Sequence, residues 1–349
     1  MLKNFYMVKM KKILSIVIPT YNMEKYLRKC LNSLIIDDAE LFVLLEVLVV
    51  NDGSKDSSSE IAHEFENKYP EIFRAIDKDN GNYGSCVNVG LKEASGKYIK
   101  ILDADDTFEK SNFKNFLSLL CRIDVDMVIS DYTIVTESDA TRRVCSYNLP
   151  HQTLFSYTKD LQDLKKLKMH AVTYKCDNLK RINYEQTEGV SYTDLEWIFF
   201  PITTVVNIYY FNQVIYKYLV GRDGQTVNLS IYYNRVQDRI KGAVTMINEI
   251  KNDFNKIYQD YLNHLLLGRL EGIYLSCLVV NRDDSLLEDF DNYIERHLPA
   301  EIYERLNLSN VNRLLKYRYI KRWRYTRKLP PIYITWCHML IKKMQEVIS

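Results

Sequence analysis

The chain lacks the patterns typical of disulfide-bonded, zinc-binding and membrane-spanning proteins. Its seven cysteines are scattered, with no Cys-x-x-Cys pair, so we expect reduced thiols and a cytoplasmic protein. None of the six histidines belongs to a His-x-x-x-His pattern, which argues against a zinc site. No stretch reaches the roughly 18 consecutive apolar residues of a spanning helix, so the sequence predicts none.

A glycine-rich phosphate loop is also missing from the place where a dinucleotide-binding protein would carry it. Pro19-Thr20-Tyr21-Asn22 follows the first predicted strand, where a Gly-x-Gly-x-x-Gly loop would bring the backbone close to a pyrophosphate. This argues against a dinucleotide-dependent oxidoreductase or a nucleotidyltransferase on a similar sheet.

Composition is ordinary for a folded protein, but charge is unevenly distributed. The 349 residues are 47% hydrophobic and 26% charged, enough for about two domains with a sizeable core. The net charge is only +2, yet residues 311–349 carry ten Lys and Arg and a single acid. The rest of the chain is therefore net acidic, and its tail is basic.

Strand and helix signals alternate over the first 130 residues. Buried strands are predicted at residues 13–18, 44–50, 73–76, 98–102 and 127–130, with helices between them. Such strands predict an α/β fold with a mostly parallel sheet covered by helices on both faces. Long helical periodicity follows over residues 231–250 and 254–280. We therefore predict a first domain over residues 1–224 and a helical C-terminal domain over residues 225–349.

Asp103-Ala104-Asp105 follows the apolar run Tyr98–Leu102 and is the strongest local signal of a site. Residues two apart in a strand share a face, so we expect the carboxylates of Asp103 and Asp105 to point the same way. Two such anions repel each other unless a cation lies between them, and Mg²⁺ or Mn²⁺ bound to a diphosphate would supply it. A solvated acidic turn would show the same residues.

Two other predicted strands also end in polar residues. Thr20-Tyr21-Asn22 follows the first strand, and Asp52 follows the second. Ligands of parallel α/β sheets bind at the carboxyl ends of the strands, so these groups should meet the acidic turn at one edge. This convergence favours a binding site over an isolated turn.

Four segments in this order resemble a family-2 glycosyltransferase of the GT-A fold. They are Ser15 to Asn22, Val49 to Asp56, Asn80 to Gly90, and Gly96 to Asp106. The resemblance is strong over residues 13–110 and weaker to about residue 200. It implies a Rossmann-type sheet and an inverting, metal-dependent transfer of a sugar from a nucleotide donor, UDP-linked by preference, to a hydroxyl acceptor. Bacterial capsule, exopolysaccharide or teichoic-acid-type glycan synthesis is the implied setting.

The same resemblance assigns roles to the residues of these segments. Asp52 would accept an N–H of the uracil-type base, with Thr20 and Tyr21 framing the nucleoside. Asp105 would hold Mg²⁺ or Mn²⁺. Asp103 would contact the ribose, or would hold the metal directly or through a bound water. The full set expected to bind the donor and metal is Pro19, Thr20, Tyr21, Asp52, Asn82, Gly84, Asp103, Ala104 and Asp105. The loop glycines can equally be turn glycines. Val87 stands where the family more usually has Arg, so no phosphate contact is inferred there.

The resemblance also implies a general base that takes the proton of the acceptor hydroxyl. Thr193-Asp194 stands where the family usually has Glu-Asp at the start of a helix. Asp194 is therefore the predicted base, with Glu188 and Glu196 as alternatives. A plain helix-terminal acid is the remaining interpretation of Asp194.

The basic tail over residues 311–349 mixes Lys and Arg with Tyr and Trp. This composition suits an anionic membrane surface, so we expect a peripheral protein on the inner face of the cell membrane and a glycan or lipid-linked glycan acceptor. A basic face packed on the protein, or a homo-oligomer contact, remains open. No nucleic-acid recognition motif occurs. The alternative function is a non-catalytic nucleotide-sugar-binding or membrane scaffold protein on the same fold.

Overall fold

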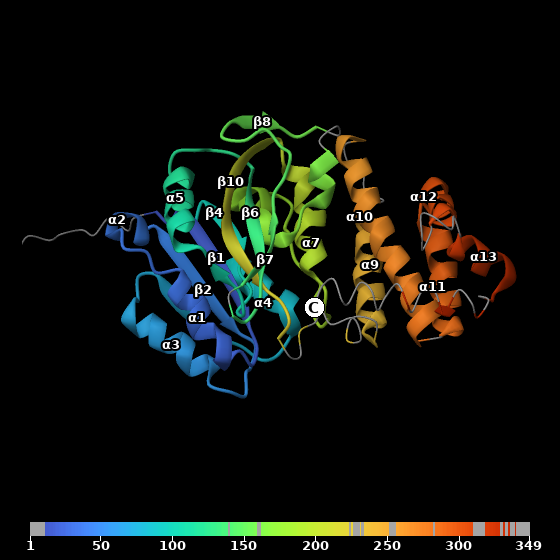
Figure 1. Cartoon of the computed structure of the whole chain (residues 1–349), viewed down its shortest axis with the longest axis horizontal. Helices are drawn as coiled ribbons and strands as arrows, with labels where there is room; N and C mark the ends of the chain where they lie inside the picture. Colours follow the sequence, from blue (N-terminus) through green and yellow to red (C-terminus); the bar gives the residue numbers. More distant parts are fainter. Residues whose placement is uncertain are drawn as a thin grey trace, which may run out of the picture.

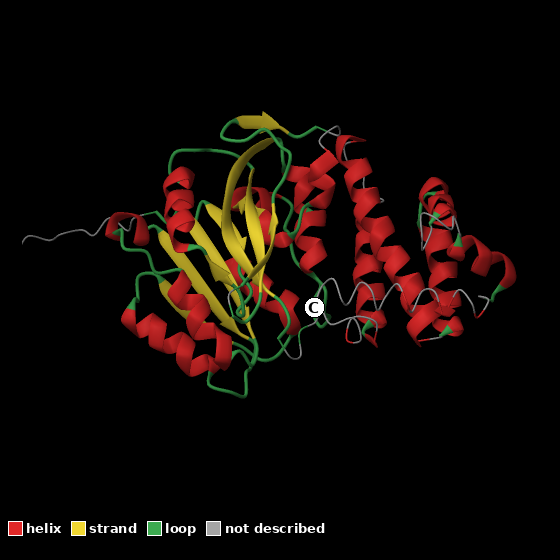
Figure 2. Cartoon of the chain, in the orientation of Figure 1, coloured by secondary structure: helices red, strands yellow, loops and turns green. Residues whose placement is uncertain are grey.

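The structure, a computed structural model, combines one large sheet with a group of helices at its side (Figures 1 and 2). It describes residues 11–138, 140–158, 162–222, 225, 231, 234–250, 256–281, 283–309, 318–328, 331, 334–335 and 339. The strands are β1 (Leu14–Thr20), β2 (Leu45–Asn51), β3 (Phe73–Asp77), β4 (Tyr98–Ile101), β5 (Thr107–Phe108), β6 (Met127–Val135), β7 (Thr141–Cys145), β8 (Leu154–Ser156), β9 (Val172–Lys175) and β10 (Asn207–Leu219). The helices are α1 (Glu24–Ser33), α2 (Ala39–Phe42), α3 (Ser58–Lys68), α4 (Asn82–Glu93), α5 (Lys110–Leu120), α6 (Cys176–Arg181), α7 (Asp194–Phe199), α9 (Val236–Ile250), α10 (Lys256–Leu275), α11 (Asp284–His297), α12 (Ala300–Arg305) and α13 (Tyr319–Thr326).

The first half of the sheet is the parallel layer that the sequence predicts. Strands β3, β2, β1 and β4 lie side by side in that order and run parallel. Every residue of β1 and β4 is buried, as expected for strands covered on both faces. Their shared direction brings the carboxyl ends of β1, β2 and β4 to one edge of the sheet.

The second half of the sheet combines parallel and antiparallel strand pairs. Strand β9 runs antiparallel between β4 and β6, while β6 and β10 pair in parallel. Strands β5, β7 and β8 add antiparallel pairs. The predicted α/β fold with flanking helices is confirmed, but the parallel arrangement holds for only part of the sheet.

Helix α4 is held against the parallel layer by a glycine. The helix packs on β1 and β2. A Cβ atom on Gly90 would lie 2.3 Å from Cγ1 of Val17 in β1, closer than packed carbon atoms approach. Any side chain at this position would push α4 away from the sheet, and with it the N-terminal end of α4 that faces the carboxyl edge.

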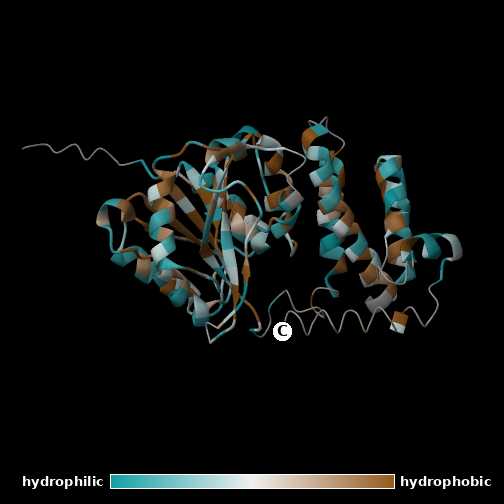
Figure 3. Cartoon of the chain, turned by 45° about the horizontal axis from the view of Figure 1, so that its top comes forward, coloured by the Kyte–Doolittle hydropathy of each residue, from teal (hydrophilic) through white to brown (hydrophobic). Residues whose placement is uncertain are grey.

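The helical C-terminal region, which the sequence predicts, packs directly on the sheet-containing part. The Tyr261 hydroxyl of α10 donates to the Ile198 carbonyl of α7 (3.0 Å), and the Tyr258 hydroxyl donates to the Val205 carbonyl (2.7 Å). Polar and apolar residues alternate around these helices (Figure 3), and their buried residues join the same hydrophobic core as the sheet. The predicted boundary near residue 224 lies in a stretch largely outside the described residues.

Helix α13 is the main described segment of the basic tail. Its residues Tyr319, Ile320 and Trp323 are buried, and the Arg324 guanidinium donates to Asp291 of α11 at 2.9 Å. The opposite side exposes Lys321, Arg322, Tyr325, Arg327 and Lys328. Most of residues 329–349 lie outside the described residues. Among the helices described, none is both long and apolar enough to cross a bilayer.

Candidate active site

Asp52 is fixed at the carboxyl edge between β1 and β2. It is 3% exposed, and its N–H donates to the Thr20 carbonyl at 2.8 Å. Its Oδ1 accepts from Lys78 Nζ at 2.7 Å and from the Gly81 N–H at 2.9 Å. These donors satisfy one carboxylate oxygen and fix its direction. Lys78 was not predicted as part of the site.

The end of β1 places its polar residues in two environments. Pro19 and Thr20 are buried in the strand, and the Thr20 hydroxyl donates to the Ile18 carbonyl at 3.1 Å. Tyr21, one residue later, is 46% exposed. Asn22 then has a positive φ of 52°, and its side chain accepts the N–H of Lys55. This link holds the loop after β1 against the loop after β2.

The acidic residues after β4 form a turn rather than an extension of the strand. Strand β4 ends at Ile101, and the N–H of Asp106 donates to the Asp103 carbonyl at 2.9 Å. The two-residue alternation expected for Asp103 and Asp105 therefore does not apply. Instead, Asp103 lies close to Asp106 and His170. Each of these three residues offers one atom that could bind a metal ion, and the three atoms lie within 4.8 Å of one another.

Strand β10 and helix α4 hold this turn in place. The Tyr216 hydroxyl and the Leu219 N–H, both of β10, donate to the two oxygens of Asp106 at 2.6 and 2.7 Å. The Tyr83 hydroxyl of α4 donates to Asp103 at 2.7 Å. Burial, followed by the charges of Asp105 and Asp103, raises the pKa of Asp106. Asp106 therefore positions the turn, a role that the sequence analysis did not assign.

His170 offers a neutral nitrogen to the same cluster. Its ring lies 4.8 Å from that of Tyr216 and 4.4 Å from that of Tyr218. Its buried Nδ1 has no hydrogen-bond partner among the described residues. Burial, and then the charge of Lys100, lowers the pKa of His170 to about 3. The imidazole is therefore unprotonated at neutral pH, the form that binds metal ions.

The residues present fit a divalent cation. Burial raises the pKa of Asp103 to about 7, and the neighbouring charge of Asp105 adds to the effect. A cation would stabilise the ionised carboxylate, and carboxylate oxygens with a neutral imidazole are suitable ligands for Mn²⁺ and similar ions. Asp105 itself is paired with Arg222, whose Nε lies 2.5 Å from its Oδ2.

Asp194, the predicted base, is one of the charges that act on the acidic turn. It is exposed at the start of α7, and its charge contributes to raising the pKa values of Asp103 and Tyr83, after burial and closer groups. Glu188 instead accepts from the side chain of Asn88 at 2.9 Å. Glu196 is 1% exposed and accepts the Thr187 N–H at 2.8 Å.

The loop at the start of α4 is shaped partly by packing. A Cβ atom on Gly84 would lie 2.2 Å from the Thr187 carbonyl oxygen, so a close backbone contact already requires a glycine there. Asn82 has a positive φ of 67°, and its carbonyl accepts from the Ser85 hydroxyl at 2.7 Å. Ala104 is buried inside the acidic turn. The predicted donor contacts of these three residues stay predictions.

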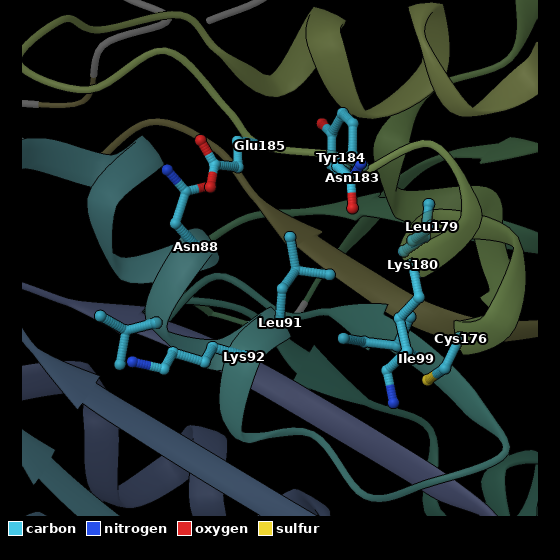
Figure 4. A pocket seen from close by; sticks show the side chains of 11 residues that line it. Asn88, Leu91, Lys92, Ile99, Cys176, Leu179, Lys180, Asn183, Tyr184 and Glu185 are labelled. Atoms are coloured by element: carbon cyan, nitrogen blue, oxygen red, sulfur yellow. The ribbon is translucent and has the colours of Figure 1, made fainter.

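A cavity of about 430 Å³ lies between α4 and α6 (Figure 4). Leu91, Ile99 and Leu179 form apolar parts of its lining, and Lys92 and Lys180 contribute to it as well. It contains none of the acidic residues of the turn, so the site described above does not include it.

Comparisons with known proteins show related glycosyltransferases. The sequence profile described as "Glycosyl transferase family 2" matches residues 15–182. The "Uncharacterized glycosyltransferase MG025" of Mycoplasma genitalium is 30% identical over 226 residues, covering 63% of this chain and 72% of that protein. The "Minor teichoic acid biosynthesis protein GgaB" of Bacillus subtilis is 30% identical over 252 residues, but these cover 70% of this chain and only 27% of GgaB.

The fold is shared with a solved structure. S. aureus TarS 1-349, crystallised in complex with UDP-GlcNAc, superposes with a TM-score of 0.64 at 17% identity. The match covers 90% of this chain and 92% of that one. It therefore includes most of the helical C-terminal region as well as the sheet.

Proposed function

We propose that the chain, which belongs to glycosyltransferase family 2, moves a sugar from a UDP-type donor to a hydroxyl acceptor. The transfer would invert the configuration at the anomeric carbon. The observation that carries this proposal is that the start of α4 contacts two of the predicted donor-site residues, Asp52 through the Gly81 N–H and Asp103 through the Tyr83 hydroxyl. The shared fold with TarS, which was crystallised with UDP-GlcNAc, supports the choice of a uridine nucleotide.

The donor base would bind at Asp52. Lys78 and the Gly81 N–H both donate to one carboxylate oxygen of Asp52. These hydrogen bonds fix the direction of the carboxylate before the nucleotide binds. A buried acceptor that matches a base N–H discriminates strongly against bases lacking that donor. The exposed ring of Tyr21 and the neighbouring Thr20 would border the nucleoside.

The diphosphate would bind beside the acidic turn. Asp103 and Asp105 would hold Mg²⁺ or Mn²⁺. His170 is a further candidate ligand, because its buried Nδ1 has no hydrogen-bond partner in the described part of the chain. When bound, the ion would supply a Lewis acid that neutralises charge on the leaving diphosphate. Tyr83 and Tyr216 would keep the turn in the shape that binds it.

Asp194 would act as the general base. Its exposed carboxylate would take the proton of the acceptor hydroxyl while the oxygen attacks the anomeric carbon and the nucleoside diphosphate leaves. A single displacement of this kind inverts the configuration and needs no nucleophilic side chain. Glu196 is a weaker candidate, because its carboxylate is buried and bonded to the Thr187 N–H.

The acceptor would be a bacterial surface glycan or its lipid-linked precursor. The relationship to GgaB, which is named for teichoic acid biosynthesis, supports this class. Exposed Lys321, Arg322 and Lys328 on and beside α13 suit an anionic membrane surface. We propose a peripheral position on the cytoplasmic face of the membrane, where such acceptors would be accessible.

A thermal-shift panel of UDP-, GDP- and dTDP-sugars, each with and without Mn²⁺, tests the donor. Ligand stabilisation grows with the ratio of concentration to Kd, so a UDP-sugar with Mn²⁺ should give the largest shift. Release of UDP in the presence of an acceptor, with the product anomer assigned by NMR, then tests transfer and inversion. A larger shift with a GDP- or dTDP-sugar, or retention of configuration, would contradict the respective part of the proposal.

A further inference from the structure

The carboxylate of Asp105 already has a cationic partner within the protein. Arg222 follows the last strand of the sheet, and its Nε lies 2.5 Å from Asp105 Oδ2. Both side chains are largely buried, with 14% and 9% of their surfaces exposed. A partly buried charge pair of this geometry is a strong contact. Arg222 therefore neutralises the charge of Asp105.

The guanidinium also rests on an aromatic ring that is itself anchored. Its central carbon lies 5.6 Å from the centroid of the Tyr26 ring of α1. The Tyr26 hydroxyl donates to Glu137 at 2.8 Å. Arginine stacks well on such faces, so Tyr26 offers a surface along which the guanidinium can move without losing all its contacts.

The surroundings of Arg222 allow such a movement. A polar cavity of about 540 Å³ adjoins it, lined among others by Tyr26, Glu137, Gly221 and Arg222 itself. The preceding residue, Gly221, has a φ of +92°, and a Cβ atom placed there would meet no atom of the described residues within 4 Å. Backbone freedom and open space thus lie next to the charged side chain.

We propose that Arg222 exchanges partners during donor binding: it neutralises Asp105 in the free protein and moves to the donor diphosphate when a metal ion takes its place at Asp105. This inference rests on the proposed metal-dependent function. It adds that the binding of the metal ion and the binding of the nucleotide are thermodynamically coupled through Arg222. A guanidinium and a divalent cation placed beside the same carboxylate repel each other, so the ion pair of Arg222 with Asp105 opposes the binding of a metal ion there. A diphosphate provides the displaced arginine with a new, bidentate anionic partner.

The exchange predicts opposite effects on two binding steps. Without nucleotide, the metal must displace Arg222 from Asp105, so Arg222 weakens metal binding. With the diphosphate present, Arg222 contributes to binding instead. By linkage, nucleotide and metal should each strengthen the binding of the other, and the coupling should shrink when Arg222 loses its charge.

Arg222→Met tests this, because methionine removes the charge and keeps an apolar stem. Free Mn²⁺ is followed by electron paramagnetic resonance during titration of nucleotide-free protein, and UDP binding at saturating Mn²⁺ is measured by calorimetry. We expect R222M to bind Mn²⁺ alone roughly tenfold more tightly and UDP roughly tenfold more weakly, the size of one charge-assisted hydrogen bond. Arg222→Lys, which keeps a cation, is the matched control and should stay closer to the wild type in both titrations.

Equal or weaker binding of Mn²⁺ alone by R222M would overturn the exchange, as would unchanged binding of UDP. Neither result would contradict the proposed function. The metal requirement is tested separately, by measuring UDP binding to the wild-type protein in Mn²⁺ and in chelator. If the wild-type protein binds UDP equally well in chelator, the metal-dependent function itself is wrong.

Discussion

Asp194 is exposed at the first residue of α7, and its charge acts on Asp103 and Tyr83. A residue that only removes the acceptor proton should contribute little to nucleotide binding. We predict that Asp194→Asn lowers kcat for transfer by about 10²- to 10⁴-fold and leaves the Kd for UDP near the wild-type value. Steady-state kinetics and calorimetry measure the two quantities.

Glu188→Gln is the matched control for Asp194. Glu188 accepts a hydrogen bond from Asn88, and a glutamine can replace that contact, so this variant should retain transfer activity. The assignment of the base is wrong if E188Q loses transfer while D194N retains it, or if D194N abolishes UDP binding.

Lys100 is a buried amine beneath the site, and its protonation should be visible in the stability of the fold. Its Nζ donates to the His170 carbonyl at 2.7 Å, and burial lowers its pKa to about 7. The unfolded chain keeps this proton up to about pH 10. Between these values the unfolded state binds more protons than the folded state. The free energy of unfolding should therefore rise with pH, by at most about 1.4 kcal/mol per unit.

Urea unfolding at about pH 7.5 and about pH 9 measures this rise, with Lys100→Met as the reference, because methionine cannot titrate. The wild-type protein should gain more stability between the two pH values than K100M does. If both proteins change by the same amount, Lys100 does not lose its proton in this range.

Single site residues were predictable when they directly follow a recognisable strand. Asp52 and the acidic turn come directly after apolar runs, so their place at the carboxyl edge followed from the sequence. Lys78, His170 and Arg222 reach the site by tertiary contacts with residues 26 or more positions away. A lone Lys, His or Arg carries no local signal of such contacts. The one available hint at Arg222 is the apolar segment Tyr218-Leu219-Val220, which ends just before Gly221 and Arg222.

At the scale of elements, the parallel strands were predicted and the long strand β10 was not. Strands β1, β2 and β4 are short apolar runs, a pattern typical of fully buried strands. Strand β10 alternates between buried, half-buried and exposed residues over 13 positions and contains two register shifts against β6. These irregularities break the period of two that marks a strand. Strand β4 also ends one residue earlier than the sequence predicts, so the acidic residues form a turn and do not continue the alternation of the strand.

The contact between α4 and β1 offers a test at this scale. Gly90→Ala would place a Cβ atom 2.3 Å from the Val17 side chain, and such overpacking costs about 1–3 kcal/mol. We predict a loss of that size in the free energy of unfolding, measured in urea. Because α4 also carries Tyr83 toward Asp103, UDP binding should weaken as well.

Val17→Ala serves as the partner in a double-mutant cycle. Val17→Ala removes the methyl groups that the new Cβ atom at position 90 would meet. The double variant should therefore lose less free energy of unfolding than the two single variants lose in sum. Strict additivity would mean that the predicted clash is not the cause of the loss.

At the scale of the whole molecule, the sheet and the C-terminal helices share one hydrophobic core. The sequence predicted long helices after residue 225, but their docking could not be predicted. It depends on hydroxyls such as those of Tyr258 and Tyr261, which donate to carbonyls near α7. The loop that ends in Asp194 is held in the same way, since Arg269 of α10 donates to the Tyr192 carbonyl at 2.8 Å. The helical region thus supports the proposed base.

The exposed basic side of α13 gives a prediction for the molecule as a whole. We expect the protein to co-sediment with vesicles containing anionic phospholipids and to leave them at high salt. Lys321→Gln, Arg322→Gln and Lys328→Gln together should weaken this binding roughly a hundredfold or more, since each basic residue contributes about 1 kcal/mol near such a surface. Equal binding to neutral vesicles, or an unchanged affinity of the triple variant, would contradict the membrane assignment.

The proposed activity depends on one divalent ion that joins the acidic turn to a uridine diphosphate. A calorimetric titration of UDP into the wild-type protein, in Mn²⁺ and then in chelator, measures this dependence, and Asp105→Asn repeats it without one ligand. We predict clear binding in Mn²⁺, its loss in chelator, and a large reduction in D105N. Binding of UDP that is equally tight in Mn²⁺, in chelator and in D105N would contradict the account.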